Sequence, residues 1–476
     1  MIRVYCDSNI YRMVKPTSKQ FNQTVYDHLE RIRKNAIFAC SDAHLDDLNK
    51  SPEHFRLEDL ELMGSYTNDF YFEYNQLNKK TEFYLTNPVA AYNSKDFNLY
   101  NSSLENPFDL RNILGQFKDN PDLEMILPLI EGFLQLPISS FGHYLPQSDL
   151  DERTQKMIEH MVPGYNPGMT VEEFYDSFRP YTKSFLHETA EMDLIKKTTA
   201  ESMNKDDFSF AKWGMDFNEQ FAKTPLKKTF IEALDLLTVG DQKKDLWLNF
   251  QYAYGLIDVF NIADERAGGK RKRNSFLSLS KDCSHAFNAM SCDYFVTNDK
   301  GLLVKSHILY NLFGHQSTEI VSVDELNKLS INTDNQISFL NLIEDLKKLN
   351  TPLDVEDENY YFFNLENSFI HFFDVVAKEK IEIDSFILQN GKDSGRNFIY
   401  KEIQFIANKI VTALGNDYEG NGLVTTGDIE NSDLDKLLRC WHFRSYIIGM
   451  VCDKSTLTFQ LRIVFAQAEP ELARLV

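Results

Sequence analysis

The sequence predicts an α/β protein in which a core with a central parallel sheet is interrupted by a mainly helical insertion and followed by an α+β domain. Segments typical of strands and helices alternate over residues 1–65 and again over 275–330, which is the pattern of a parallel sheet. Residues 66–274 show helical segments separated by polar loops, without clear strand alternation. Residues 331–476 begin with a helical segment and continue with mixed segments.

The first part of the core contains two predicted strands, each followed by a helix. The first strand, Ile2–Cys6, is rich in β-branched and aromatic residues. A helix is predicted over residues 18–34, where apolar side chains recur along one face. The second strand is predicted over residues 36–40, and Ser41 or Asp42 is the expected N-cap of the next helix.

The second part of the core repeats this alternation. Asp282 is expected to begin a helix, and residues 294–296 form a short apolar strand that leads into Thr-Asn-Asp. A helix over 302–312 and a strand over 319–323 follow. Outside the core, residues 246–260 are expected to form a buried helix. Residues 455–465 alternate as an antiparallel strand would.

Length and composition indicate a soluble, cytoplasmic protein of about three domains. At roughly 150 residues per domain, the 476 residues correspond to about three domains. Hydrophobic residues make up 43% and charged residues 25%, as is usual for globular proteins. No run approaches the roughly 18 apolar residues that span a bilayer, and the first residues lack the layout of a signal peptide.

The net charge of the chain argues against one class of nucleic-acid-binding protein. The net charge is 50 − 71 = −21, which argues against non-specific coating of nucleic acid, because phosphates require Lys and Arg. It does not exclude a nuclease, since a metal-binding site needs carboxylates. The six cysteines include no C-x-x-C pair, so a zinc site is not expected.

Four acids stand at the ends of predicted strands or in the helices that follow them. Asp7 directly follows the first strand, and Asp299 follows the strand over 294–296 after two polar residues. Asp47 lies one turn into the helix after the second strand, and Asp282 is the expected helix start. Ligands of open parallel sheets bind beyond the carboxyl ends of the strands, so these acids are expected to share one pocket.

Several carboxylates in one pocket require protons or a cation. Two carboxylates about 4 Å apart repel by roughly 4 kcal/mol at an effective dielectric constant near 20. Mg²⁺ and Mn²⁺ prefer carboxylate oxygen and water as ligands. Two such ions activate an attacking water and stabilise the leaving oxygen of a phosphodiester. The acids therefore predict metal-dependent hydrolysis.

Four sequence blocks, in this order, carry a family resemblance: VYCDSNIY, ACSDAHLDDL, DCSHAFNAM and CDYFVTNDKGLL. Together they resemble the signature blocks of PIN-domain nucleases, and the last block does so most closely. The resemblance implies a three-layer α/β/α PIN-like core over residues 1–65 and 275–330, Mg²⁺ or Mn²⁺ as cofactor, and a nucleic-acid substrate, RNA in preference to DNA. It implies four metal-binding catalytic acids, which are Asp7, Asp47, Asp282 and Asp299.

The same resemblance places Thr297 and Asn298 in the loop that shapes the site, with Ser8 or Asn9 close to the metals. Two features depart from the family pattern. About 210 residues lie between the second and third blocks, which a helical insertion over 66–274 explains. The family usually has Glu before Leu in the second block, where this chain has Asp46 and Asp47, so Asp46 or Asp42 remains an alternative ligand.

Other residues are candidates for substrate contact. His285 lies one turn after Asp282, where it either contacts a phosphate or, as we favour, packs and orients a ligand. His44 has the same two interpretations. A dense basic run precedes the third block and either holds a nucleic-acid backbone or forms a solvated loop; it consists of Lys270, Arg271, Lys272 and Arg273.

These observations favour a metal-dependent endonuclease, with a bacterial toxin or defence role as one setting for it. An alternative is a PIN-like binding or scaffold module that acts only within a complex, with a protein partner or as a homo-oligomer. A phosphatase of the haloacid dehalogenase type also places an Asp after its first strand. That family requires D-x-D, whereas this chain has Asp7, Ser8 and Asn9 in succession.

Overall fold

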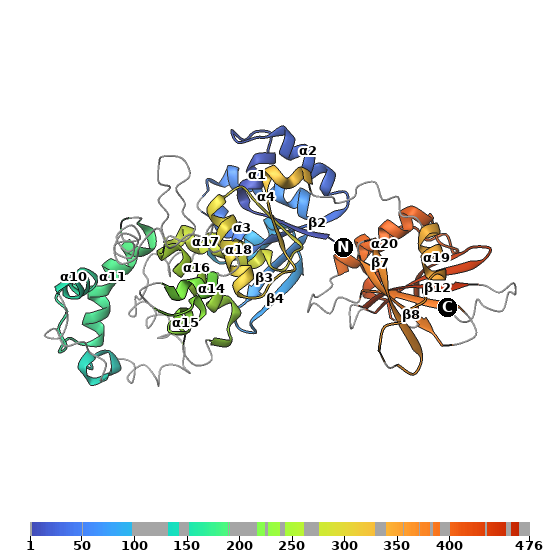
Figure 1. Cartoon of the computed structure of the whole chain (residues 1–476). Coiled ribbons are helices and arrows are strands. Elements are labelled where there is room, and N and C mark those ends of the chain that lie inside the picture. Colours follow the sequence, from blue (N-terminus) through green and yellow to red (C-terminus); the bar gives the residue numbers. More distant parts are fainter. Residues whose placement is uncertain are drawn as a thin grey trace.

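Over the residues that it describes, the computed structural model contains two six-stranded sheets (Figure 1). The structure describes residues 2–49, 51–97, 132–141, 152–188, 190, 217–223, 227–238, 243–260, 276–328, 339–355, 357–370, 372–380, 384–390, 400–433, 436–453 and 458–465.

The first sheet has the strand order β4-β3-β2-β1-β5-β6. All neighbouring pairs are parallel except β3 and β4, which are antiparallel at the edge. The predicted α/β class is therefore confirmed, although the sheet is mixed rather than wholly parallel. Its strands are β1 (Ile2–Cys6), β2 (Ala36–Ser41), β3 (Phe70–Asn75), β4 (Lys80–Leu85), β5 (Tyr294–Thr297) and β6 (Glu319–Ser322).

Strand β1 joins the two distant parts of the sequence in one sheet. On one side Val4 is in register with Phe38 of β2, and on the other side Cys6 is in register with Val296 of β5. Four of its five residues are buried, as expected for an interior strand that is covered on both faces. The carboxyl ends of β1, β2 and β5 consequently lie side by side.

Helices cover both faces of this sheet. Val4 and Phe38 point to one face and share a buried cluster with residues of α1 (Ser8–Val14), α2 (Gln23–Ile32), α3 (Asp42–Leu48), α4 (Glu53–Thr67) and the 3-10 helix η7 (Val323–Lys328). Tyr5 and Phe295 point to the other face. They share a cluster with α16 (Leu246–Val259), α17 (Phe276–Ala289) and α18 (Lys300–Leu312).

The hairpin of β3 and β4 lies in a segment that the sequence predicted to be helical, and that prediction is wrong for residues 70–85. Aromatic residues of β3 belong to the buried cluster on one face of the sheet, with Phe70 and Phe72 fully buried. The connecting turn is formed by Asn75, whose side chain accepts the N–H of Leu77 at 2.9 Å, and by Lys79 at φ 58°. The hairpin is short and partly polar, so the alternation of apolar and polar residues that identifies a strand is not clear in the sequence.

The remaining described elements of this segment are helical. They are α5 (Pro88–Ser94), η1 (Ile138–Phe141), α10 (Glu152–Met161), α11 (Val171–His187), α14 (Phe217–Gln220), η5 (Phe221–Lys223), α15 (Phe230–Asp235) and α16. The expected buried helix over 246–260 is confirmed, since α16 buries Phe250, Ala253 and Ile257 completely.

The helix predicted over residues 18–34 is shorter, since α2 spans Gln23–Ile32 after the N-cap Asn22. Two further helix starts, both near candidate acids, also differ from those predicted. Helix α17 begins at Phe276, so Asp282 is in its interior and is not its first residue. Apolar residues before Asp282, including the buried Leu279, pack against the core and extend the helix toward the N-terminus. Helix α18 begins at Lys300, with Asp299 as its N-cap. Both shifts change the backbone setting of a candidate acid.

The second sheet is antiparallel throughout, with the order β10-β11-β12-β9-β8-β7. The predicted strand near the C-terminus is confirmed for Thr458–Phe465, and its alternate residues Phe459, Leu461 and Ile463 are buried. The elements of this part are α19 (Phe339–Lys347), β7 (Tyr360–Phe369), β8 (Phe373–Glu379), β9 (Ser385–Gln389), α20 (Tyr400–Leu414), α21 (Thr426–Glu430), β10 (Leu437–His442), β11 (Tyr446–Asp453) and β12.

Helix α20 docks against the amino-terminal ends of the strands in the first sheet. The guanidinium of Arg3, at the start of β1, pairs with Glu402 at 2.5 Å, and the two side chains are 1% and 0% exposed. Lys409 of α20 also donates a hydrogen bond to the side chain of Asn35, just before β2, at 3.0 Å. The second sheet is therefore joined to the edge opposite the strand ends that carry the acids.

Among the helices of the described residues, none combines the length and the apolar character needed to cross a membrane.

Candidate functional site

Asp7 lies at the carboxyl end of β1 and is the N-cap of α1. Its Oδ1 accepts hydrogen bonds from the backbone N–H groups of Asn9 at 2.8 Å and Ile10 at 3.1 Å. Its Oδ2 accepts the hydroxyl of Thr297, the last residue of β5. Asp7 is 2% exposed, and burial raises the pKa of its carboxyl, an effect that the Thr297 hydrogen bond partly offsets.

The hydroxyl of Thr297 links Asp7 to Asp299. While it donates to Asp7, its oxygen accepts the backbone N–H of Asp299 at 3.0 Å. Oδ1 of Asp299 in turn accepts the N–H groups of Gly301 and Leu302 at 2.9 and 3.1 Å, which caps α18. In both acids the capping bonds go to Oδ1. The ends of two neighbouring strands thus hold two carboxyl groups in fixed positions.

Asp282 faces the same region from the interior of α17. It is partly buried, and among the described residues none donates a hydrogen bond to its carboxyl. Burial and, second, the charge of Asp299 raise the pKa of Asp282 to about 7, while Lys305 acts in the opposite direction. Because Asp282 is not a helix N-cap, capping does not explain its presence there. It is an acid near its own titration point beside another carboxylate.

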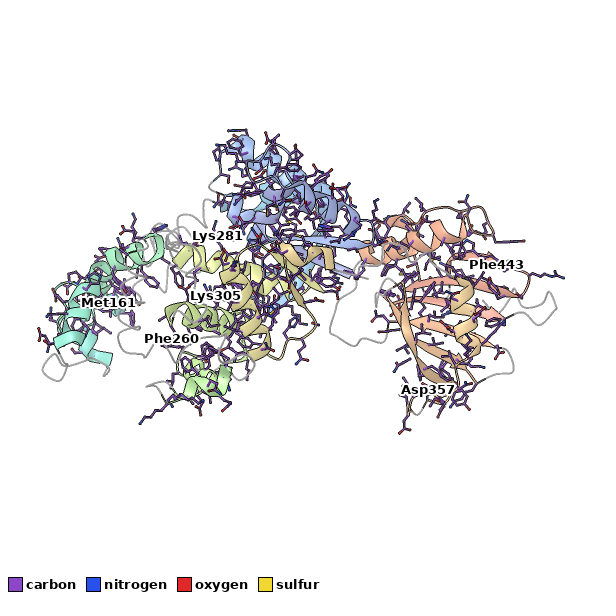
Figure 2. The ribbon with its side chains drawn as sticks, turned by 45° about the horizontal axis from the view of Figure 1, so that its top comes forward. Met161, Phe260, Lys281, Lys305, Asp357 and Phe443 are labelled. Atoms are coloured by element: carbon purple, nitrogen blue, oxygen red, sulfur yellow. The ribbon has the colours of Figure 1, made fainter. Side chains whose placement is uncertain are left out.

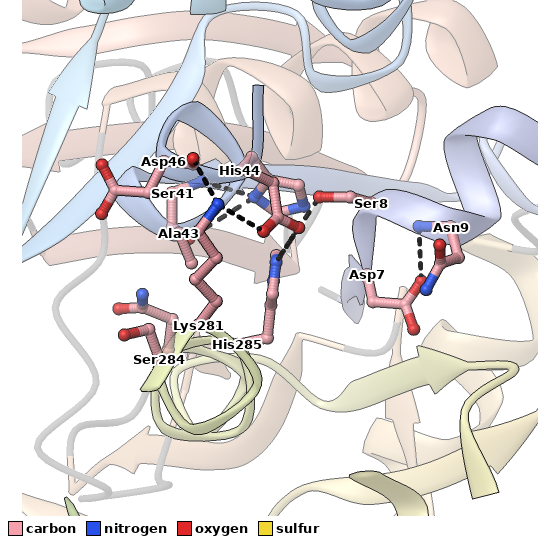
Figure 3. Close-up of polar contacts among 12 residues, drawn as sticks. Asp7, Ser8, Asn9, Ser41, Ala43, His44, Asp46, Lys281, Ser284 and His285 are labelled. Carbon is pink, nitrogen blue, oxygen red and sulfur yellow. Dashed lines mark hydrogen bonds and ion pairs between the residues drawn. The ribbon is translucent and has the colours of Figure 1, made fainter. Parts of the chain in front are cut away.

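Asp47 of α3 contacts Lys281 and His285 of α17. Figure 3 shows these two α17 side chains directed toward α3. Nε2 of His285 donates to its Oδ2 at 3.0 Å, and Nζ of Lys281 lies 3.5 Å from its Oδ1. Burial alone would raise the pKa of Asp47, but the hydrogen bond and charge of His285, followed by the charge of Lys281, lower it below the usual range. Asp47 is therefore ionised at neutral pH.

The contacts of Asp47 differ from those of Asp42 and Asp46, which the sequence left as alternative ligands. Asp46 pairs with Lys95 at 2.7 Å, and Asp42 accepts the side-chain amide of Asn288 at 2.8 Å. Only Asp47 of the three contacts His285, and its charge also acts on Asp282. Asp47 is thus the member of α3 that belongs to the acidic group.

His285 connects Asp47 to the sheet. Its side chain is 3% exposed, and its Nδ1 lies 2.9 Å from the hydroxyl of Tyr5, which in turn lies 2.7 Å from Oγ of Ser41. Burial lowers the pKa of His285, but the hydrogen bond and charge of Asp47 outweigh it and raise that pKa overall. His285 accordingly orients a carboxylate, which is the interpretation that the sequence favoured.

His44 has a structural role. Its Nδ1 accepts the backbone N–H of Ser41 at 3.1 Å, and its Nε2 donates to the carbonyl oxygen of Cys6 at 2.7 Å. Burial and, second, the charge of His285 lower the pKa of His44 to about 3, so its ring is neutral. It completes the cap of α3 and fixes the end of β1, one residue before Asp7.

The other residues predicted to contact substrate differ in their surroundings. Asn9 is partly buried and accepts a hydrogen bond from Arg12 at 3.2 Å, next to the cap formed by Asp7. Asn298 is exposed between Thr297 and Asp299. The basic run lies outside the described residues, and it comprises Lys270, Arg271, Lys272 and Arg273.

Sequence reasoning missed the side chains that join α17 to α3. Lys281, His285 and Asn288 recur at i, i+4 and i+7 on one face of α17, and they contact Asp47 and Asp42 of α3. That spacing could be read from the sequence, because residues four and seven apart lie on one face of a helix. What it faces was not visible, because α3 lies more than 200 residues earlier.

A buried ion pair behind the acids was also missed. Lys305 of α18 pairs with Asp258 of α16 at 2.8 Å, and the two side chains are 1% and 3% exposed. The lysine also lies over the ring of Tyr254, with Nζ 5.1 Å from the centroid. Figure 2 shows Lys281 and Lys305 on the helices beside the first sheet. The inserted helix α16 is therefore fastened directly to the site region.

The donor chemistry of the site fits a hard divalent cation, because its acids offer carboxylate oxygens and Asp282 lacks a hydrogen-bond donor among the described residues. Within the part of the chain that the structure describes, no group of three or more His, Cys, Asp or Glu side chains stands in an arrangement that holds a metal ion. The four acids are neighbours, but they do not form a preassembled ligand cage.

Comparison of the chain with models of known protein families, with curated proteins and with solved structures found no match.

Proposed function

We propose that this protein is a divalent-metal-dependent endonuclease with a PIN-like core, and that RNA is its substrate. One observation carries the proposal: Asp7, Asp47, Asp282 and Asp299 come from two distant parts of the sequence and gather near the carboxyl ends of the parallel strands β2, β1 and β5. That edge is where α/β sheets bind their ligands. The four blocks that resemble PIN-domain nucleases each contribute one of these acids.

The electrostatics of the four acids support the same proposal. The charge of Asp299 acts on Asp282 strongly enough to help raise its pKa to about 7. A divalent cation bound by these carboxyl groups would replace the proton and offset the repulsion between their charges. Stability alone gives no reason to gather such groups, because like charges in a partly buried site oppose folding.

Some of these residues would hold the metal, and others position the residues that hold it. Asp7, Asp282 and Asp299 would hold the metal, with Asp47 as a further carboxylate. When bound, the metal supplies an activated water and charge stabilisation for phosphodiester hydrolysis. Thr297 keeps Asp7 and the backbone of Asp299 at a fixed separation. His285 holds Asp47 in its charged form and fixes the direction of its carboxylate.

The direct test is cleavage of single-stranded RNA, transfer RNA and single-stranded DNA with Mg²⁺ or Mn²⁺. We expect Asp7→Asn and Asp299→Asn to abolish cleavage, because each removes a negative metal ligand without changing side-chain size. Asp47→Asn and Asp46→Asn form a matched pair on adjacent residues of α3. The first is expected to reduce cleavage strongly, and the second to leave it near the wild-type rate, since Asp46 is paired with Lys95. Equal cleavage by wild type, Asp7→Asn and Asp299→Asn would sink the proposal.

A further inference from the structure

Asp47 is held by two side chains of α17, His285 and Lys281, which differ in their freedom to move. His285 is 3% exposed and is fixed between Asp47 at 3.0 Å and the Tyr5 hydroxyl at 2.9 Å. Lys281 is 28% exposed and lies one turn earlier on the same face. Its ammonium stands 3.5 Å from Asp47 and donates to the backbone carbonyl of Asp46 at 2.7 Å (Figure 3).

These contacts hold Lys281 only weakly. An ion pair that is long and partly exposed contributes little, because water screens it. The bond to the Asp46 carbonyl can be replaced by water, since the lysine stands at the solvent edge. Rotation of the flexible four-carbon side chain would therefore release the ammonium at small cost, whereas His285 would have to break a buried chain of hydrogen bonds.

A phosphodiester that enters the acidic group is negatively charged, so a protein cation beside it would favour its binding. Lys305 is 1% exposed and committed to Asp258, so it cannot reach the substrate. His285 is buried and committed to Asp47. Lys300 is exposed at the start of α18, and no described side chain forms a hydrogen bond or ion pair that positions it. Lys281 lies on α17, one residue before Asp282, and reaches α3, where it contacts Asp47 and the carbonyl oxygen of Asp46.

We propose that Lys281 binds the substrate phosphate next to the scissile bond, exchanging its contact with Asp47 for a phosphate oxygen. This inference rests on the proposed nuclease function and assigns the protein cation of that site. It gives α17 two roles on one face, since His285 positions a carboxylate while Lys281 receives the substrate one turn away.

The experiment compares Lys281→Gln, Lys281→Arg and wild type in steady-state cleavage of a fluorescent single-stranded RNA. The matched control is Lys156→Gln, which removes an exposed lysine paired with Glu152 on the remote helix α10. KM and kcat are measured from about 50 to about 200 mM salt. Melting temperatures and Mn²⁺ affinity are measured for every variant, because a lysine that only joins α17 to α3 would change the melting temperature.

For Lys281→Gln we expect KM to rise about tenfold and the salt dependence of KM to fall by about 0.7 in logarithmic slope, the value for one phosphate contact on a single strand. Lys281→Arg is expected to recover most of the loss, and Lys156→Gln to match wild type. Mn²⁺ affinity should be unchanged or tighter, because Asp47 loses a competing cation.

The results separate this inference from the function on which it rests. If wild type cleaves and Asp7→Asn does not, but Lys281→Gln keeps the wild-type KM and salt slope, the role of Lys281 is wrong and the nuclease remains. A lower melting temperature with an unchanged salt slope likewise shows that the lysine is structural. If wild type cleaves no nucleic acid with either metal, the proposed function fails, and the role of Lys281 fails with it.

Discussion

The buried ion pair between Arg3 and Glu402 connects the two sheets, and Glu402→Gln is the smallest change that breaks it. The variant keeps the size of the side chain and removes its charge, so Arg3 stays cationic where both side chains are almost fully buried, at 1% and 0% exposure. The aromatic rings of Phe70 and Phe83 lie 5.7 and 5.2 Å from the guanidinium carbon, but they do not replace a carboxylate.

The expected cost follows from burial. Removing one partner of a buried ion pair destabilises a protein by about 3–5 kcal/mol, because the remaining charge loses its compensation in a medium of low dielectric constant. The amide of glutamine still accepts a hydrogen bond from Arg3, which places the expected loss at about 3 kcal/mol. Replacing both partners, as in Arg3→Met with Glu402→Leu, should return stability to within about 1 kcal/mol of wild type.

Urea denaturation followed by circular dichroism measures these losses, with Lys156→Gln as a control. That control breaks an exposed pair and should cost about 0.5 kcal/mol or less. A loss below about 1 kcal/mol for Glu402→Gln would refute the reasoning, since it would mean that water reaches the pair. RNA cleavage by the variant should stay at the wild-type rate under native conditions, because the pair lies at the opposite end of β1 from Asp7.

Three further predictions concern the acidic site. His285→Gln should lower cleavage about 10- to 100-fold with little change in substrate KM, because Asp47 loses the cation that orients it; steady-state kinetics checks this. The pKa of Asp282 is raised to about 7 in the folded chain, so between about pH 4 and pH 7 the folded state binds a proton that the unfolded state has released. The stability of the metal-free protein, measured in EDTA, should therefore fall as the pH rises through this range. Asp282→Asn should remove that slope in melting temperature, and a slope that persists would assign it to other groups. Thr297→Val should cost about 1–3 kcal/mol, because Asp7 and the N–H of Asp299 both lose a buried partner; chemical denaturation tests it, and a neutral result would show that water replaces the hydroxyl.

The sequence allowed the strands of the core to be placed to within about one residue. Ile2–Cys6 and the strands near Ala36, Tyr294 and Glu319 are short apolar runs bounded by polar residues. Such runs are recognisable because strands buried on both faces exclude polar side chains. The positions of Asp7 and Asp299 followed directly, since each comes after such a run.

The hairpin of β3 and β4 and the start of α17 were not predictable in the same way. Phe70 and Phe72 alternate with Tyr71 and Glu73, and only the packing of β3 beside β2 shows that this is a strand of the sheet. Local propensity favours Asp282 as a helix start, but the tertiary burial of Leu279 extends the helix past it.

The choice among Asp42, Asp46 and Asp47 depends entirely on partners that are distant in sequence. Asn288, Lys95 and His285 each select one of the three. Helix geometry alone puts Asp42 and Asp46 on one face and turns Asp47 away from them, because residues four apart align and neighbours do not. Which face meets the acids is decided by the packing of α17 against α3, and no pattern within ten residues of Asp47 contains that information.

The two ends of β1 have different roles: one contacts the C-terminal part of the chain, and the other carries a candidate catalytic acid. Arg3 at the amino end binds α20, and Asp7 at the carboxyl end caps α1 within the acidic group. The C-terminal part therefore reaches the edge of the sheet that carries no candidate acid. The insertion reaches the other edge, because Asp258 of α16 pairs with Lys305, whose charge acts on Asp282. Selection of substrate is accordingly expected from the insertion, and the C-terminal part is expected to affect cleavage mainly through the stability of β1.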